Sequence, residues 1–109
     1  MDTKLIDCAV KIAACVCGKD GVISHTEELA IYEYVNTRYV EYSQERFNDT
    51  LDEFFDESHQ IEMYLNYITD INFKDFIINL CEFSAGSDGL DIKENIALEK
   101  VKIVLSEGL

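Results

Sequence analysis

Residues 18–35 read GKDGVISHTEELAIYEYV, and residues 86–105 read GSDGLDIKENIALEKVKIVL. Each stretch opens on a glycine, passes through an Asp-Gly pair typical of tight turns, and continues into a segment whose apolar residues recur with helical spacing. An apolar segment of helical length precedes each stretch. The chain therefore carries the same pattern twice, a helix followed by an Asp-Gly turn and a capped helix, and this pattern predicts a helical fold.

The whole chain contains five glycines and no proline, and helix-start signals divide it into its remaining segments. An apolar helix is predicted over residues 5–17, and Ser24 followed by Glu27 forms a capping box that predicts the start of a second helix. Further helices are expected to begin after Ser43, near Ser58, at the cap Asn72, and at Asp91 with its partner Glu94. A chain of 109 residues has room for one hydrophobic core. We expect one domain, residues 1–109, folded as a compact all-α bundle of about five to six helices.

The first helix is expected to be the most buried, because its polar residues are confined to a narrow stripe formed by Lys4, Asp7 and Lys11. Apolar residues at helical spacing predict the inner faces of the other helices. These predicted inner faces are Leu29, Tyr32, Val35 and Tyr39; Phe47, Leu51, Phe54 and Phe55; Ile61, Leu65 and Ile68; Phe73, Phe76, Ile77, Leu80 and Phe83; and Ala97, Val101, Val104 and Leu105.

The charge balance restricts the class of partner. The chain has 22 acidic and 9 basic residues, for a formal net charge of −13, so direct nucleic-acid binding is not expected. An acidic surface selects cationic partners, such as metal ions or basic protein surfaces. No apolar run approaches the roughly 20 residues that span a bilayer, and the N-terminus lacks the cationic start of a signal peptide. We expect a cytoplasmic protein without membrane insertion.

The four cysteines, Cys8, Cys15, Cys17 and Cys81, are expected to be reduced core thiols, since three of them share one apolar helical segment. Zinc binding by Cys15, Cys17 and His25 is the less favoured interpretation, because no second pair of ligands follows. The two histidines, His25 and His59, do not form an acid-base centre with any catalytic motif. We therefore expect no enzymatic activity.

The middle third of the chain is strongly acidic: residues 41–70 hold nine acidic residues against a single base, Arg46. Acids interleaved with apolar residues at helical spacing are typical of the solvated back of an amphipathic helix. They are also typical of a docking surface for a basic protein. If a partner binds here, the residues expected to contact it are Asp49, Asp52, Glu53, Asp56 and Glu57.

Ala13 and Ala14 lead into KDGVISHTEE, and the second copy reads SDGLDIKE before an apolar helix that closes on Gly-Leu. This arrangement resembles the TerB-like family, named for tellurite resistance, whose related domains also occur in J-domain cochaperones. The resemblance covers about residues 5–40 and 73–109. It implies an all-helical domain in which acids near the two turns hold a divalent cation such as Ca²⁺. By position those acids are Asp20, Glu27, Asp88 and Glu94.

The same four acids also have structural explanations that need no metal. Asp20 and Asp88 are turn formers, and Glu27 and Glu94 close capping boxes. Both explanations stay open. The resemblance implies a non-enzymatic adaptor in a stress response, bound to a protein partner. The charge and size of the chain also fit an alternative, an immunity protein that covers the basic active site of a nuclease toxin.

Overall fold

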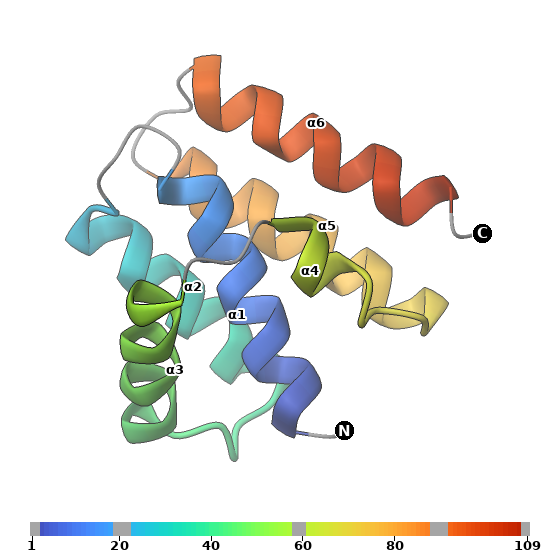
Figure 1. Ribbon diagram of the computed structural model, residues 1–109. Helices are drawn as coiled ribbons and strands as arrows, with labels where there is room; N and C mark the ends of the chain where they lie inside the picture. Colours follow the sequence, from blue (N-terminus) through green and yellow to red (C-terminus); the bar gives the residue numbers. More distant parts are fainter. Residues whose placement is uncertain (1–2, 19–22, 58–60, 88–91, 108–109) are drawn as a thin grey trace.

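The helix predicted to be most buried, α1 (Thr3–Cys17), forms the centre of the molecule and contacts each of the other helices. In this computed structural model, residues 3–18, 23–57, 61–87 and 92–107 are described. Seven residues of α1 have no exposed surface, and three of them are alanines, which let neighbouring helices approach closely: Ala9, Val10, Ile12, Ala13, Ala14, Val16 and Cys17. The core is therefore built around the apolar sides of α1 (Figure 1).

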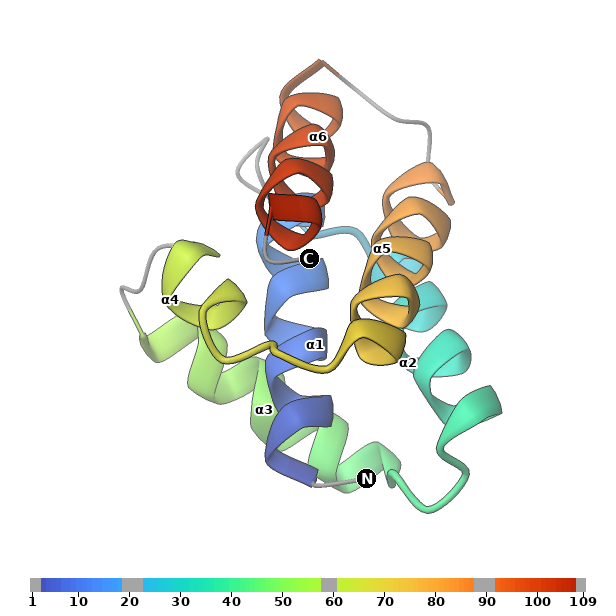
Figure 2. The same ribbon diagram turned by 90° about the vertical axis from the view of Figure 1, so that its right-hand side faces the viewer.

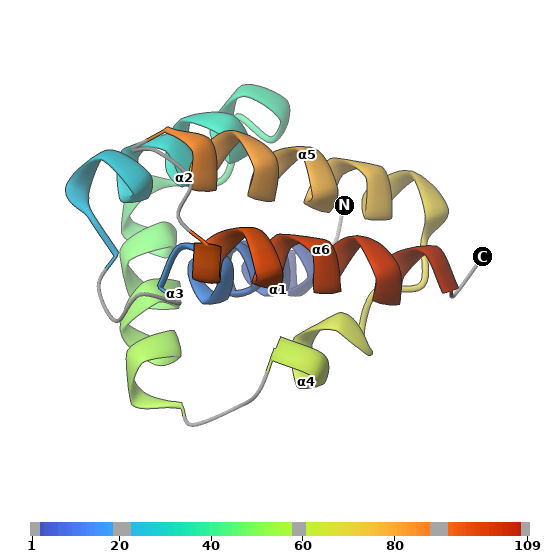
Figure 3. The same cartoon turned by 90° about the horizontal axis from the view of Figure 1, so that it is seen from above.

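Five further helices surround α1 within the described residues: α2 (His25–Arg38), α3 (Gln44–Asp56), α4 (Ile61–Leu65), α5 (Ile71–Gly86) and α6 (Ile92–Glu107). Viewed with α1 in the middle, α3 and α4 lie on one side, α5 and α2 on the other, and α6 covers the top (Figure 2). From above, α6 lies between α4 and α5 and contacts both (Figure 3). The described chain contains no strand, so the predicted all-α bundle is confirmed.

Local capping confirms two of the predicted helix starts. Ser24 and Glu27 form the expected capping box: Glu27 N donates to Ser24 Oγ at 3.1 Å, and Ser24 N donates to Glu27 Oε1 at 2.9 Å. Ser43 caps α3, since its Oγ accepts a hydrogen bond from Arg46 N at 3.1 Å. The predicted starts at Ser58 and Asp91 lie outside the described residues.

The predicted cap of α5 was wrong by two residues. Asp70, not Asn72, is the N-cap, and the helix begins at Ile71. Asp70 Oδ1 accepts hydrogen bonds from Asn72 N at 2.8 Å and from Phe73 N at 3.1 Å. A carboxylate at this position satisfies two amide donors and carries the negative charge that a helix N-terminus favours, so it is a better cap than an amide two residues later.

Three predicted core residues are exposed instead: Leu29 (43%), Phe55 (59%) and Phe83 (51%). In each case other residues of the same helix occupy the buried face. In α2 the buried face is carried by Ala30, Ile31 and Val35, which places Leu29 outside it. The helical spacing of apolar residues does not decide which of them are buried, because burial depends on which neighbouring helices pack against the helix.

The four cysteines, all within the described residues, form no disulfide; Cys8, Cys17 and Cys81 are buried and Cys15 is partly buried, in line with the predicted core positions. Burial raises the pKa of Cys8 to about 11 and also raises that of Cys81, so both stay protonated at neutral pH. In the part of the chain that the structure describes, none of the helices is both long and apolar enough to cross a bilayer.

Candidate functional site

Helix α3 has two chemically different sides beyond its buried face. Its core contacts come from Phe47, Thr50 and Leu51, which are buried. On the opposite side, four acids recur at intervals of four, three and four residues, which places them along one outward line of the helix. We call this line the outer stripe; its members, all exposed, are Glu45, Asp49, Asp52 and Asp56.

The side of α3 that faces α1 carries acids that are already paired. Lys11 of α1 is largely buried, and its Nζ lies 2.9 Å from Glu57 Oε1 and 3.4 Å from Glu53 Oε1. Tyr64 of α4 donates to the same Glu57 oxygen at 2.8 Å. Burial alone would lower the pKa of Lys11, but the two carboxylates outweigh it and raise that pKa, so Lys11 stays charged.

Asp7 of α1 anchors the other end of the same side. Tyr42 Oη donates to Asp7 Oδ1 at 2.7 Å, the Thr50 hydroxyl lies 3.0 Å from that oxygen, and Arg46 binds both carboxylate oxygens. Burial by itself raises the pKa of Asp7, but these hydrogen bonds and the Arg46 charge lower it overall. We call these contacts of Lys11 and Asp7 with α3 the inner flank.

The predicted partner-binding acids are therefore divided between the two sides. Asp49, Asp52 and Asp56 lie together on the outer stripe, and among the described residues none of them forms an ion pair. Glu57 instead faces α1 as part of the inner flank, where it has a structural role. Glu53 lies at the border: its side chain is 65% exposed, although it reaches Lys11.

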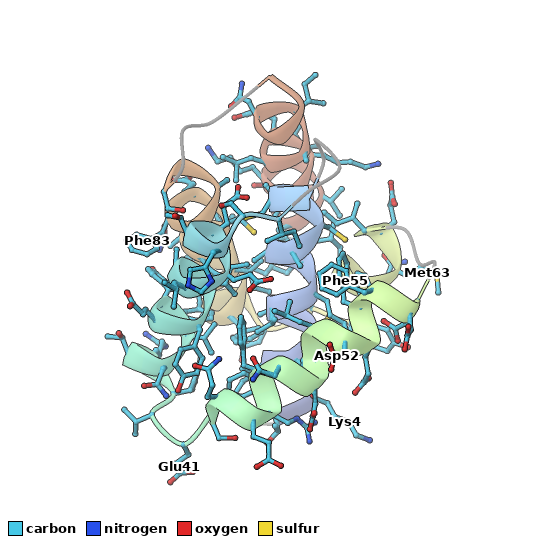
Figure 4. The ribbon with its side chains drawn as sticks, turned by 90° about the vertical axis from the view of Figure 1, so that its left-hand side faces the viewer. Lys4, Glu41, Asp52, Phe55, Met63 and Phe83 are labelled. Atoms are coloured by element: carbon cyan, nitrogen blue, oxygen red, sulfur yellow. The ribbon has the colours of Figure 1, made fainter. Side chains whose placement is uncertain are left out.

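Exposed apolar side chains lie near the outer stripe, on both sides of α3. Phe55 lies on one side of α3 while Asp52 points outward from the helix and Lys4 of α1 lies on the other side (Figure 4). Next to the inner flank, a groove of about 600 Å³ opens between α1, α3 and α4. Met63 and Tyr67, 47% and 69% exposed, stand at this groove with Leu5. A partner could thus meet both carboxylates and apolar side chains here.

Sequence reasoning missed two parts of this site. Glu45 was counted among the acids of the middle third but was not assigned to the docking surface, although its spacing to Asp49 already puts it on the outer stripe. Phe55 was assigned to the core but is 59% exposed; on a helical projection it lies between the buried Leu51 and the exposed Asp52, so its spacing left both outcomes open. A full angular projection of residues 44–56 would have found Glu45 but not the exposure of Phe55.

The predicted cation ligands are only partly described. Glu27 is almost fully buried, and one of its oxygens is used by the cap of α2. Asp20, Asp88 and the side chain of Glu94 lie outside the described residues. In the described residues, no three His, Cys, Asp or Glu side chains are grouped so that they could hold a metal ion. The C-terminal end of α1 and the N-terminal end of α6 lie at the same end of the bundle (Figures 1 and 3).

Of the two histidines, His25 is exposed at the start of α2, and His59 lies outside the described residues. No protein-family model, curated protein or solved structure matches this chain. The likeness to the TerB-like family therefore stays a prediction.

Proposed function

We propose that this chain is a non-enzymatic binding protein whose outer stripe docks onto the basic surface of a protein partner. The observation that carries the proposal is the row of four exposed acids, Glu45, Asp49, Asp52 and Asp56, without ion-pair partners among the described residues. The first and last acids are eleven helical steps apart, a span of about 16 Å. This length is enough for several lysine or arginine side chains to bind side by side.

The stripe is costly for the isolated protein, since like charges three and four residues apart on a helix repel one another. A cationic partner converts that repulsion into attraction. The net charge of −13 adds a long-range field that accelerates encounter with a basic protein. Phe55 supplies exposed apolar area beside the stripe, which favours a protein surface over a simple cation.

The inner flank supports this proposal by fixing α3 in place. Lys11 and Asp7 connect α1 to α3 at two points, and the Tyr32 and Phe47 rings meet at a centroid distance of 5.3 Å between α2 and α3. A helix held at three points loses little conformational freedom on binding. The acids of the outer stripe are thus presented on a rigid support.

A comparative pull-down tests the proposal. Wild type is compared with a stripe variant, Asp49→Asn/Asp52→Asn/Asp56→Asn, and with a matched control that neutralises three exposed acids elsewhere, Glu33→Gln/Glu41→Gln/Asp75→Asn. Both variants lose three negative charges. We expect a basic protein to be captured by wild type and by the control, and to be lost at least about tenfold from the stripe variant. Equal loss in the two variants would show that only net charge matters, and would reject the site.

The biological setting that we propose is that of the TerB-like resemblance, an adaptor in a cytoplasmic stress response that also reads a divalent cation through Asp20, Glu27, Asp88 and Glu94. Because Glu27 already serves the α2 cap, the cation would draw mainly on the other three acids. Titration with Ca²⁺, Mg²⁺ and Zn²⁺ while following the thermal midpoint tests this part, with Asp20→Asn/Asp88→Asn as control. No rise in the midpoint at millimolar ion would remove the cation from the proposal.

A second candidate is a toxin-neutralising immunity protein, in which the same stripe covers the basic active site of a nuclease. The groove beside the inner flank favours it, because an apolar side chain of an enzyme surface could enter between Met63 and Tyr67. The discriminating assay is nuclease activity of the captured partner, measured with and without this chain. Inhibition that the stripe variant fails to produce supports immunity, and a partner without nuclease activity rejects it.

A further inference from the structure

The groove between α1, α3 and α4 combines a buried polar floor with an exposed apolar rim. Lys11, Tyr64 and Cys8 line it and are all buried. Met63 and Tyr67 line it as well and are exposed; we call these two residues the rim. The volume of about 600 Å³ lies within the roughly 300–1,000 Å³ range of ligand sites. This part of the surface is therefore a recess with buried walls, not a flat apolar face.

Hydrogen bonds hold the walls of the groove in place in the unbound chain. Cys8 Sγ of α1 donates to the Tyr64 carbonyl oxygen at 3.1 Å, and Tyr64 Oη of α4 donates to Glu57 Oε1 at 2.8 Å. Tyr67 lies in the turn after α4, where its N–H donates to the Tyr64 carbonyl oxygen at 3.2 Å. Tyr64 thus connects α1, the end of α3 and the rim, so little freedom remains to be lost when the groove is filled.

The charges inside the groove are balanced, although the chain as a whole is strongly acidic. Its lining residues include three bases and three acids, namely Lys4, Lys11 and Arg46, and Asp7, Glu53 and Glu57. The inner flank pairs Lys11 with both glutamates and Arg46 with Asp7. A cation that enters here has to compete with these bases, and an anion is repelled by the net charge of −13. An uncharged apolar group meets neither obstacle, and it covers the ion pairs without leaving a charge unpaired.

The rim indicates which apolar group fits best. Met63 offers a flexible thioether, and its sulfur packs favourably against the edge of an aromatic ring. Tyr67 offers a ring, which pairs with another ring in an offset or edge-to-face arrangement. An enclosed aromatic side chain also removes roughly 150–250 Å² of its own surface from water. The occupant that suits this groove is therefore a phenylalanine or tryptophan side chain.

Glu53 connects the groove to the outer stripe. It lines the groove, follows Asp49 by four residues and precedes Asp56 by three. Side chains with these spacings are neighbours on a helix surface, at about 6 Å between their Cβ atoms. A partner that covers the outer stripe with basic side chains therefore also reaches the groove. The basic side chains and the groove occupant can then belong to the same partner surface.

We propose that the groove receives an aromatic side chain of the same basic partner, beside the lysine or arginine residues that bind the outer stripe. This inference rests on the proposed function, which supplies the partner. The two parts have different tasks: the stripe attracts the partner by its charge, and the enclosed aromatic contact slows dissociation. The recognition segment of the partner is thus a group of basic residues around one phenylalanine or tryptophan.

Two lysine peptides of roughly ten residues test the groove, one with a central phenylalanine and one with alanine at that position, so that their charges are equal. Their dissociation constants for the full chain are measured by isothermal titration calorimetry. We expect the phenylalanine peptide to bind at least about tenfold more tightly than the alanine peptide. Added salt should weaken both but leave their ratio nearly unchanged, because the groove contact is apolar. Equal affinities overturn the proposal.

Two matched variants locate the preference. Met63→Gln/Tyr67→Gln removes the apolar rim and should abolish the preference for phenylalanine, while the alanine peptide binds as it does to wild type. Val40→Gln/Ile96→Gln replaces residues that are 75% and 64% exposed and do not line the groove, and it should keep the preference. All four residues are exposed, so thermal melts of both variants should match wild type. A preference that survives in the rim variant, or that is lost from both variants, overturns the proposal.

The stripe variant Asp49→Asn/Asp52→Asn/Asp56→Asn separates this inference from the proposed function. An alanine peptide that binds this variant as tightly as wild type, or that does not bind wild type, rejects the proposed function and the groove inference with it. An alanine peptide that is weakened by the stripe variant, without any preference of wild type for phenylalanine, rejects the groove inference alone. A weakened alanine peptide together with a preference that depends on the rim supports both.

Discussion

The inner flank and the outer stripe both involve acidic side chains at α3, yet these acids have opposite surroundings. On the inner flank, Glu57 meets the nearly buried Lys11, and Asp7 of α1 binds Arg46. On the outer stripe, Asp52 and its neighbours face solvent. The difference shows that the role of an acid in this chain is decided by what the facing helix offers, not by the density of acids in the sequence.

The largest effect on this comparison is expected from removing Asp7, the acid of the inner flank that accepts the most hydrogen bonds. Asp7→Ala deletes the acceptor of Tyr42, Thr50 and Arg46 and leaves their polar groups poorly satisfied. We expect a loss of about 2–3 kcal/mol in the free energy of unfolding, measured by urea denaturation. Asp52→Ala, the matched change on the outer stripe, should stay within about 0.5 kcal/mol of wild type. Similar losses in the two variants would contradict the division.

A smaller effect is expected for the base of the inner flank. Lys11→Met keeps the apolar stem but leaves the partly buried Glu57 without its cation, so we expect a loss of about 1–2 kcal/mol. Adding Glu57→Gln to this variant should recover part of the loss, because the uncompensated charge is then gone. A Lys11→Met variant as stable as wild type would show that the pair contributes nothing.

The pH dependence of the free energy of unfolding tests the role of Asp7. Its pKa is lowered in the folded protein, so its ionised form contributes stability that is fully present above the ordinary aspartate value of about 3.9. This contribution is lost as the pH falls through the lower folded-state pKa. The difference in unfolding free energy between wild type and Asp7→Asn should therefore be largest near neutral pH and shrink below about pH 4. A difference that stays constant down to pH 2 would contradict the assignment.

The smallest change in stability is expected on the outer stripe. Neutralising Asp49, Asp52 and Asp56 together relieves repulsion along the helix, so the free energy of unfolding from urea denaturation should equal that of wild type or rise by no more than about 0.5 kcal/mol. Added salt should reduce the gain, because it already screens these charges in wild type. A clear destabilisation would mean that the stripe has structural partners.

The helices themselves were predictable because their signals are local. The Ser24 capping box, the Ser43 cap and the apolar α1 each depend on residues within one or two turns of helix. The cap of α5 was misplaced because Asp70 and Asn72 are both good caps, and the choice between them depends on where the chain enters the bundle.

The candidate site was less predictable, since it depends on contacts distant in sequence. The acids of residues 41–70 could be identified from the sequence. However, Glu57 pairs with Lys11, which is 46 residues away, and the residues around Glu57 do not predict this partner. Phe55 was misplaced for the related reason that its exposure follows from the position of α1 and α4. The stripe formed by Lys4, Asp7 and Lys11 was the one available hint that α1 has a polar side for α3 to meet.

The most direct test of the central claim is an NMR titration of the ¹⁵N-labelled chain with an oligolysine peptide of roughly ten residues, used as a probe of where cationic chains bind. We predict that amide shifts change first and most over residues 45–56, and that Asp49→Asn/Asp52→Asn/Asp56→Asn removes this response. The matched control Glu33→Gln/Glu41→Gln/Asp75→Asn should keep it. Shift changes spread evenly over the exposed acids of α2, α3 and α5 would contradict the account.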